Sequence, residues 1–134
     1  MGYSLAIIRI VGLILTYIIF GVIGLGLLTI YFLSIKYYYR SIVFFSQLWA
    51  KYSCALLNIR VKIIQKSKVC PGSIIISNHV GTPDIFVLGS CFPGFFISKS
   101  EIGQWPFIGW LVNLGATILV DRDRKQQVRA TIEE

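Results

Sequence analysis

The chain has 134 residues, of which 55% are apolar and 14% are charged, and its mean hydropathy is +0.72. Soluble globular domains carry about 25% charged residues. A disordered chain, a collagen-like repeat and an ordinary soluble enzyme are therefore poor interpretations. The formal net charge is +7, and the composition favours one small membrane-bound domain.

The basic residues are concentrated in the apolar N-terminal part of the chain. Residues 1–83 hold eight Lys or Arg and no acidic residue, whereas residues 84–134 hold five basic and six acidic residues. Cations beside apolar segments suit anionic lipid headgroups. A nucleic-acid-binding protein would instead place them on a hydrophilic face among aromatics, so we expect membrane lipids and no nucleic acid as partners.

The number and spacing of the cysteines and the histidine bear on whether the chain holds disulfides or a metal ion. Cys54, Cys70 and Cys91 are odd in number, widely spaced and without a C-x-x-C pair, which argues against a disulfide framework and a structural zinc site. With a single histidine in the chain, we expect no metal site. Unpaired thiols favour a reducing, cytoplasm-facing compartment.

Residues 10–35 contain no charged residue and are bounded by Arg9 and Lys36. A membrane-spanning helix needs about 20 apolar residues, so this segment is long enough to cross a bilayer and too long for a signal peptide core. More basic residues follow the segment than precede it, and the positive-inside rule then places its C-terminal flank in the cytoplasm. We expect a membrane protein, with the bacterial inner membrane as its location.

A second apolar stretch, residues 37–58, opens on three tyrosines beside basic residues. Aromatic and basic side chains together are typical of the headgroup region. Arg40 and Lys51 interrupt the stretch, which favours an interfacial or re-entrant helix packed against the first; a second membrane span is the alternative. Residues 1–58 are thus predicted to be membrane-anchoring helices.

Residues 59–134 are predicted to form an α/β domain, because short apolar runs alternate with helical segments and turns. Thr82 and Pro83 predict a helix start, with Thr82 as the N-cap. The stretch is short for a sheet covered by helices on both faces, so we expect a partial domain or one that depends on a partner. The predicted elements are strands at 59–66, 73–77, 94–98 and 116–120, helices at 83–91 and, interrupted by Pro106, at 100–113, and a surface helix from Asp123 onward.

One pair of residues in the chain suggests catalysis. His79 lies in the loop that follows the predicted strand 73–77, and Asp84 lies five residues on, in the first turn of the next helix. Ligands of α/β sheets gather beyond the carboxyl ends of strands. Asp84 can orient the imidazole, which can then take a proton from a substrate hydroxyl. The alternative is structural: an acid favoured by the helix dipole and an ordinary surface histidine.

The string Asn78-His79, followed by Asp84, resembles the first motif of the glycerolipid acyltransferases, the family of the lysophosphatidic acid acyltransferases. The downstream string KSEIGQWPFIGWLVNLGATILVDR resembles the second block of that family. The matching positions there are Lys99, Glu101, Pro106, Gly109, Gly115, Asp121 and Arg122. The resemblance covers about residues 59–124, and the apolar N-terminal segments agree with it.

The resemblance implies transfer of an acyl chain from acyl-CoA or acyl carrier protein to lysophosphatidate, giving phosphatidate, with no cofactor. His79 is then the general base and Asp84 its orienting partner. Arg122 is the candidate for the acceptor phosphate, because a guanidinium binds phosphate bidentately. Asn78 and Lys99 complete the candidate substrate-binding residues. The three aromatic residues Trp105, Phe107 and Trp110 either line an acyl path or act as core or interface anchors.

Two differences from the family pattern accompany this resemblance. Gly81 stands where the family has Ser, and neither the third motif, Glu-Gly-Thr-Arg, nor the Pro-containing fourth motif occurs in the chain. We therefore expect a truncated acyltransferase domain. The alternative is a non-catalytic membrane protein that keeps the anchor and binds lysolipid; an unrelated interaction protein would leave residues 78–122 unexplained.

Overall fold

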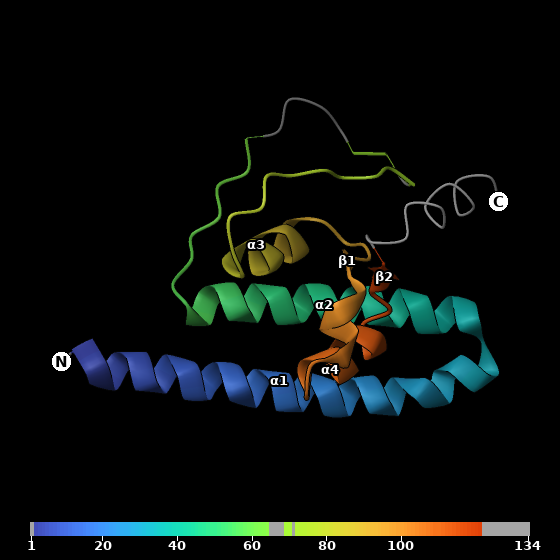
Figure 1. The fold of residues 1–134 in the computed structure, drawn as a ribbon, viewed down its shortest axis with the longest axis horizontal. Coiled ribbons are helices and arrows are strands. Elements are labelled where there is room, and N and C mark those ends of the chain that lie inside the picture. The colour runs from blue at the N-terminus through green and yellow to red at the C-terminus, as the bar shows by residue number, and fades with distance from the viewer. Residues whose placement is uncertain (1, 65–68, 71, 122–134) are drawn as a thin grey trace.

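The computed structural model describes residues 2–64, 69–70 and 72–121. Two long helices form an antiparallel hairpin, and the shorter elements lie beside it (Figure 1). The described part of the chain is mostly helical. Its elements in chain order are α1 (Gly2–Leu33), α2 (Ile35–Leu56), α3 (Pro83–Cys91), β1 (Ile97–Lys99), the 3-10 helix η1 (Ser100–Gln104), α4 (Ile108–Leu114) and β2 (Ile118–Val120).

The hairpin confirms both predicted N-terminal helices. Ser34 has an extended backbone and separates α1 from α2. Asn58 ends α2 in the left-handed conformation, with φ of 57°, and two backbone hydrogen bonds, from Asn58 to Ala55 and from Ile59 to Cys54, close the helix end as a Schellman motif. Within the described residues one segment, Tyr3–Leu33, is long and apolar enough to cross a membrane.

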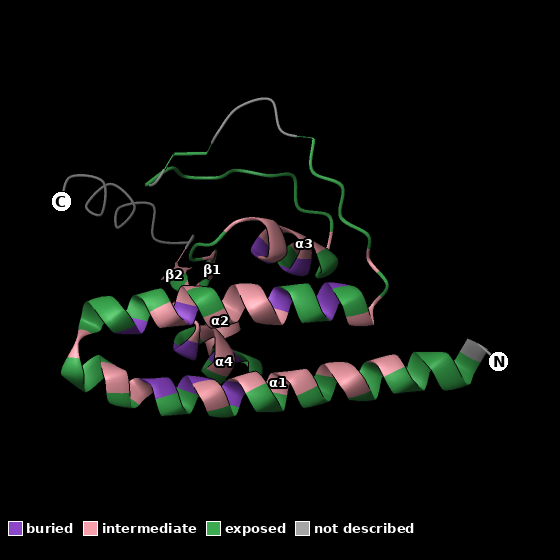
Figure 2. Cartoon of the chain, turned by 180° about the vertical axis from the view of Figure 1, so that it is seen from behind, coloured by how far each residue is buried: buried purple, intermediate pink, exposed green. Residues whose placement is uncertain are grey.

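The main core lies between the two long helices near their connecting turn. Leu27 from α1 and Tyr38 and Ile42 from α2 are its buried members, and Ala116 from the C-terminal part packs against them. The Tyr38 hydroxyl donates a hydrogen bond to the Leu114 carbonyl at 3.4 Å. In Figure 2, buried positions gather where the helices meet. The C-terminal elements are therefore docked on the hairpin.

Helix α3 has the predicted bounds and lies on α2. The two helices approach closely at Gly89, where an added Cβ would lie 3.0 Å from the Ala50 Cβ. Gln47 on α2 donates a hydrogen bond to the Ser90 carbonyl at 3.2 Å, and Trp49 on α2 packs edge-on against Phe86 at 5.2 Å between ring centroids. These contacts fix α3 on the hairpin.

Strands β1 and β2 fall within or beside two predicted strands, 94–98 and 116–120, and pair in parallel. Between them the predicted broken helix appears as η1 and α4, which are separated around Pro106. The two short helices approach so closely that a Cβ on Gly109 would overlap the Gly103 carbonyl. This position accepts only glycine unless the backbone moves.

The predicted strands at 59–66 and 73–77 are wrong for the residues described. Residues 59–64 and 72–80 are irregular and run outstretched above α3 (Figure 1); we call these two segments together the arm. A strand needs a neighbour for its backbone hydrogen bonds, and within the described residues the sheet contains β1 and β2 alone. Ile74 and Ile76 are 81% and 91% exposed. The residue pattern of these segments indicated an extended backbone, but it did not show whether another strand lies alongside to pair with it.

The α/β prediction for residues 59–134 is therefore correct only in part. A parallel pair of strands with an intervening helical segment is present, whereas the larger sheet that the four predicted strands imply is not formed by the described residues. The helix predicted from Asp123 onward lies outside the described residues.

Candidate active site

The predicted His79–Asp84 pair is in contact. His79 lies at the end of the arm, and Asp84 lies in the first turn of α3, which Pro83 begins. The chain turns between them, with the Asp84 N–H donating to the Gly81 carbonyl at 3.0 Å. His79 Nδ1 then lies 3.1 Å from Asp84 Oδ2. The loop overcomes the angular separation that a continuous helix would impose at this spacing.

Asp84 has two further partners, which the sequence did not predict. The backbone N–H groups of Val80 and Gly81 donate to the same carboxylate oxygen at 2.6 Å and 3.0 Å. The backbone hydrogen bonds from Gly81 and Val80, followed by the interaction with His79, hold the pKa of the Asp84 carboxyl below its usual value. Hydrogen bonds to the charged form favour that form, so Asp84 is a carboxylate at neutral pH.

The carboxylate fixes the orientation of the imidazole. With Nδ1–H donating to Asp84, Nε2 of His79 carries the lone pair and can accept a proton. The His79 side chain is 67% exposed and that of Asp84 is 29% exposed. The proton-accepting nitrogen is thus on a solvent-accessible ring, while its orienting partner is held by the helix and the loop. This arrangement supports general-base chemistry on an external hydroxyl.

Thr82 occupies the position before α3 as expected, but its side chain makes no capping hydrogen bond. Its backbone is already helical, with φ of −51° and ψ of −36°, whereas an N-cap residue that bonds the first turn normally has an extended backbone. Asp84 instead reaches back to the loop N–H groups. Thr82 and Pro83 therefore predicted the helix start correctly. The side chain that accepts the hydrogen bonds of the loop N–H groups is that of Asp84, not that of Thr82.

The other candidate residues are not joined to this pair in the described part of the chain. Asn78 is exposed at the end of the arm. Lys99 is exposed at the carboxyl end of β1, in register with Val120 of β2. Arg122 lies outside the described residues. A cavity of about 390 Å³ is lined by residues that include Tyr39, Phe95 and Ile118. The His79 side chain is 67% exposed, so the His79–Asp84 pair is a surface site.

Comparison with known proteins identifies the class. The family model described as Acyltransferase matches residues 58–134, and the chain therefore belongs to the acyltransferase family. This confirms the resemblance drawn from the residues around His79 and from the second block.

Three relatives give the comparison more detail. The chain is 36% identical over 72 residues to the lyso-ornithine lipid O-acyltransferase of Rhodobacter capsulatus, covering 54% of this chain and 26% of that protein. It is 33% identical over 82 residues to the 1-acyl-sn-glycerol-3-phosphate acyltransferase of Saccharomyces cerevisiae, covering 59% and 27%. For the Neisseria gonorrhoeae protein of that same name the identity is 28% over 79 residues, covering 58% and 31%.

The chain thus spans between a quarter and a third of the length of these relatives. No solved structure matches it. The names of the relatives include an acceptor, lyso-ornithine lipid, that the motif comparison did not suggest.

Proposed function

We propose that this chain takes part in the transfer of an acyl chain from a thioester donor to the free hydroxyl of a lysolipid in the membrane. The observation that carries the proposal is the 3.1 Å contact between His79 and Asp84, with Asp84 held in turn by two loop N–H groups. Family membership supports it, because the matched relatives are named as acyltransferases of lysolipids.

The proposed reaction is a direct displacement at the thioester carbonyl. Nε2 of His79 removes the proton from the acceptor hydroxyl, and the oxygen forms a bond to the carbonyl carbon. The C–S bond breaks, and the departing thiolate takes the proton back from the imidazolium. The ester product and a free thiol result, so no covalent acyl-enzyme and no cofactor is required. Asp84 keeps the ring in the right tautomer and stabilises its charged form.

The acceptor that we favour is lysophosphatidate, with acyl-CoA or acyl carrier protein as the donor. Arg122 is the proposed phosphate ligand, since a guanidinium binds phosphate through two hydrogen bonds. Lys99 is proposed to assist near the phosphate or the thioester, and Asn78 to help position the substrate beside His79. Lys99 stands at the carboxyl end of a strand, where ligands of parallel sheets bind.

Lyso-ornithine lipid is the second candidate acceptor, because the Rhodobacter capsulatus relative is named for it. The two acceptors differ in headgroup: lysophosphatidate carries a phosphate, and ornithine carries a carboxyl group together with amino groups. Arg122 can bind either anion through two hydrogen bonds, but the positive charge of an amine would weaken the attraction, so a cationic site would favour lysophosphatidate. Direct competition between the two acceptors distinguishes them.

We further propose that the chain acts at a membrane, with the His79–Asp84 pair facing the cytoplasm. The apolar helix α1 and the basic residues that follow it support this location. A membrane-bound protein that binds lysolipid without turning it over is the alternative function.

The test is an acyl-transfer assay on the chain reconstituted in phospholipid vesicles. Labelled acyl-CoA or acyl carrier protein is supplied with lysophosphatidate or lyso-ornithine lipid, and the labelled product lipid is measured. We expect label in phosphatidate. Label in the ornithine product alone would assign the second acceptor, and saturable lysolipid binding without product would establish the non-catalytic alternative.

A further inference from the structure

Three aromatic side chains, one from each of the first three helices, form a continuous row. Trp49 of α2 lies edge-on to Tyr17 of α1 and edge-on to Phe86 of α3, with 5.2 Å between the ring centroids in both pairs. Edge-to-face pairs at this distance are favourable and have a defined geometry. The indole N–H of Trp49 is buried and has no hydrogen-bond partner within the described residues. We call Tyr17, Trp49 and Phe86 the aromatic row.

Phe86 anchors the turn of α3 that carries Asp84. It is 4% exposed, and it is the buried residue of the first turn, Pro83–Phe86. Side chains two residues apart on an α-helix point about 200° apart. Phe86 and Asp84 therefore lie on opposite sides of α3, with the ring packed on α2 and the carboxylate bound to the loop.

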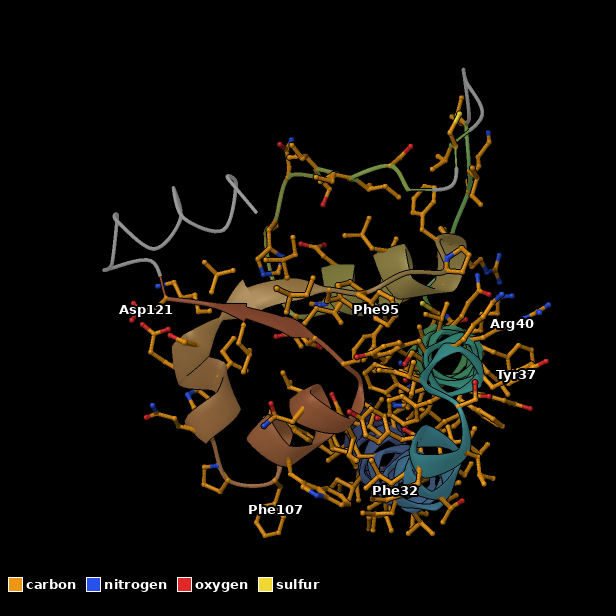
Figure 3. All side chains as sticks on the ribbon, turned by 90° about the vertical axis from the view of Figure 1, so that its right-hand side faces the viewer. Phe32, Tyr37, Arg40, Phe95, Phe107 and Asp121 are labelled. Carbon is orange, nitrogen blue, oxygen red and sulfur yellow. The ribbon has the colours of Figure 1, made fainter. Side chains whose placement is uncertain are left out.

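The position of this turn depends on α2. Helix α3 packs on α2, and Figure 3 shows the arm standing away from the helices over most of its length. Farther along α3, the Ser90 carbonyl accepts the hydrogen bond from Gln47 at 3.2 Å. That contact holds the C-terminal end of α3, whereas the contact between Trp49 and Phe86 lies two residues from Asp84.

The hydrogen bonds of Asp84 are sensitive to where this turn lies. Asp84 Oδ2 is 3.1 Å from His79 Nδ1 and accepts from the Val80 N–H at 2.6 Å. His79 and Val80 belong to the arm, and Asp84 belongs to the helix. Hydrogen bonds extend to about 3.2 Å, so a shift of the turn by about 1 Å relative to the arm would break them. A misplacement of that size can lower turnover about 10²-fold.

We propose that Trp49 is a positioning residue: through Phe86 it holds the first turn of α3 where the Asp84 carboxylate meets and orients the His79 ring. The consequence for turnover rests on the proposed acyl transfer, whereas the consequence for the geometry of the pair does not.

The first test measures the pair without substrate, in the full chain in lipid nanodiscs. The chain holds one histidine, so its ring ¹⁵N signals need no assignment. Above the histidine pKa of about 6.5, we expect the Nδ1–H tautomer, and Trp49→Leu should lose that preference. The pKa of the Asp84 carboxyl should rise toward its ordinary value of about 3.9, because the hydrogen bonds that lower it are weakened. An unchanged tautomer and pKa in folded Trp49→Leu would overturn the proposal.

Two matched variants separate positioning from general loosening of α3. Gln47→Ala removes the hydrogen bond at the other end of α3 and should leave the tautomer and the Asp84 pKa unchanged. Trp49→Phe keeps an aromatic ring and loses only an N–H without a partner in the described structure, so it should retain both properties. Changes in Gln47→Ala as large as those in Trp49→Leu would contradict the proposal.

Phe86→Leu provides the same test if Trp49→Leu does not fold, because it removes the same ring contact from its other side. We expect the same change of tautomer and the same direction of the Asp84 pKa shift. In the double variant, Trp49→Leu with Phe86→Leu, the shift should not exceed that of the larger single variant, since both substitutions remove one contact. Additive shifts would show that the two residues act separately and would overturn the proposal.

The second test measures turnover in phospholipid vesicles with labelled acyl donor. Trp49→Leu should lower kcat about 10²-fold with little change in the KM for the lysolipid, because the orientation of the base affects proton transfer rather than binding. A raised KM with normal kcat would contradict the positioning role. If the unaltered chain shows no turnover, the proposed reaction fails, and the tautomer and pKa measurements still decide whether Trp49 positions the pair.

Discussion

The helical hairpin and the arm, which are adjacent in the sequence, differ in how completely they are packed. In the hairpin, apolar side chains meet across α1 and α2 and α3 is docked on α2. In the arm, isoleucines of equally apolar character are largely exposed. A helix satisfies its backbone within its own segment, whereas a strand depends on a neighbour. Similar hydrophobicity therefore gives two helices with a packed seam in the hairpin, although the outer face of α1 is also exposed, and irregular backbone without a packed seam in the arm.

The candidate site lies where these two regions meet. His79 ends the arm, and Asp84 begins α3, so the hydrogen bonds of one carboxylate tie the open segment to the packed one. The imidazole is exposed because His79 lies in the open arm, and its orientation is fixed because Asp84 is held in the first turn of α3. This combination suits a base that must reach a hydroxyl on a separate lipid molecule.

Alanine substitutions at Ile42 and Ile76 compare the two regions directly. Ile42 is 4% exposed and Ile76 is 91% exposed. Ile42→Ala should lower the free energy of unfolding by about 2–5 kcal/mol, and Ile76→Ala should change it by less than about 0.5 kcal/mol. Denaturant unfolding in detergent, followed by circular dichroism, measures both. Equal losses would show that the arm is packed in solution, and the comparison would fail.

Gly109→Ala tests how close the packing of the C-terminal elements is. The new Cβ would overlap the Gly103 carbonyl, and relief requires η1 and α4 to separate, at a cost of about 1–3 kcal/mol. Gly26→Ala is the matched control, because no atom lies within 4 Å of a Cβ there and alanine favours a helix over glycine by about 1 kcal/mol. The midpoint temperature of thermal unfolding should therefore fall for Gly109→Ala and rise for Gly26→Ala. A neutral Gly109→Ala would contradict the close approach.

Ser53 places a buried polar group in the seam of the hairpin. Its side chain is 0% exposed, and its hydroxyl has no hydrogen-bond partner within the described residues. Ser53→Ala removes an unsatisfied polar group and should raise the free energy of unfolding by about 1 kcal/mol. Ser90→Ala is the control, because the Ser90 hydroxyl donates to the Val87 carbonyl at 2.8 Å; its loss should be slightly destabilising. A destabilising Ser53→Ala would indicate that the hydroxyl has a partner.

The pKa of Asp84 reports how the arm is held. Because folding lowers this pKa, the carboxylate stabilises the fold above the unfolded-state value of about 4, and that contribution is lost as the pH falls through the lower folded value. His79→Ala should raise the pKa only slightly, since the N–H groups of Gly81 and Val80 are the larger causes. A carboxyl NMR titration measures this. A return to the ordinary aspartate pKa would make His79 the dominant partner.

Local signals predicted most of the helical structure. The uncharged run 10–35 and Pro83 set the positions of α1 and α3, and Pro106 marks the break between η1 and α4. The irregular backbone of residues 59–64 and 72–80, where the alternation predicted strands, was not predictable in this way, because strand pairing depends on residues distant in the sequence. At the site, the spacing predicted the His79–Asp84 contact, but the N–H donors of Val80 and Gly81 depend on the loop conformation. The roles of Asn78, Lys99 and Arg122 stay predictions.

The central claim is that His79, oriented by Asp84, is the base for acyl transfer. The most direct measurement is the turnover of labelled acyl donor by His79→Ala beside Thr82→Ala, an exposed neighbour whose side chain makes no capping hydrogen bond, with membrane binding measured for both. We predict a loss of about 10²–10⁴-fold in kcat for His79→Ala, unchanged membrane binding, and near-normal turnover for Thr82→Ala. Full turnover by His79→Ala would contradict the account.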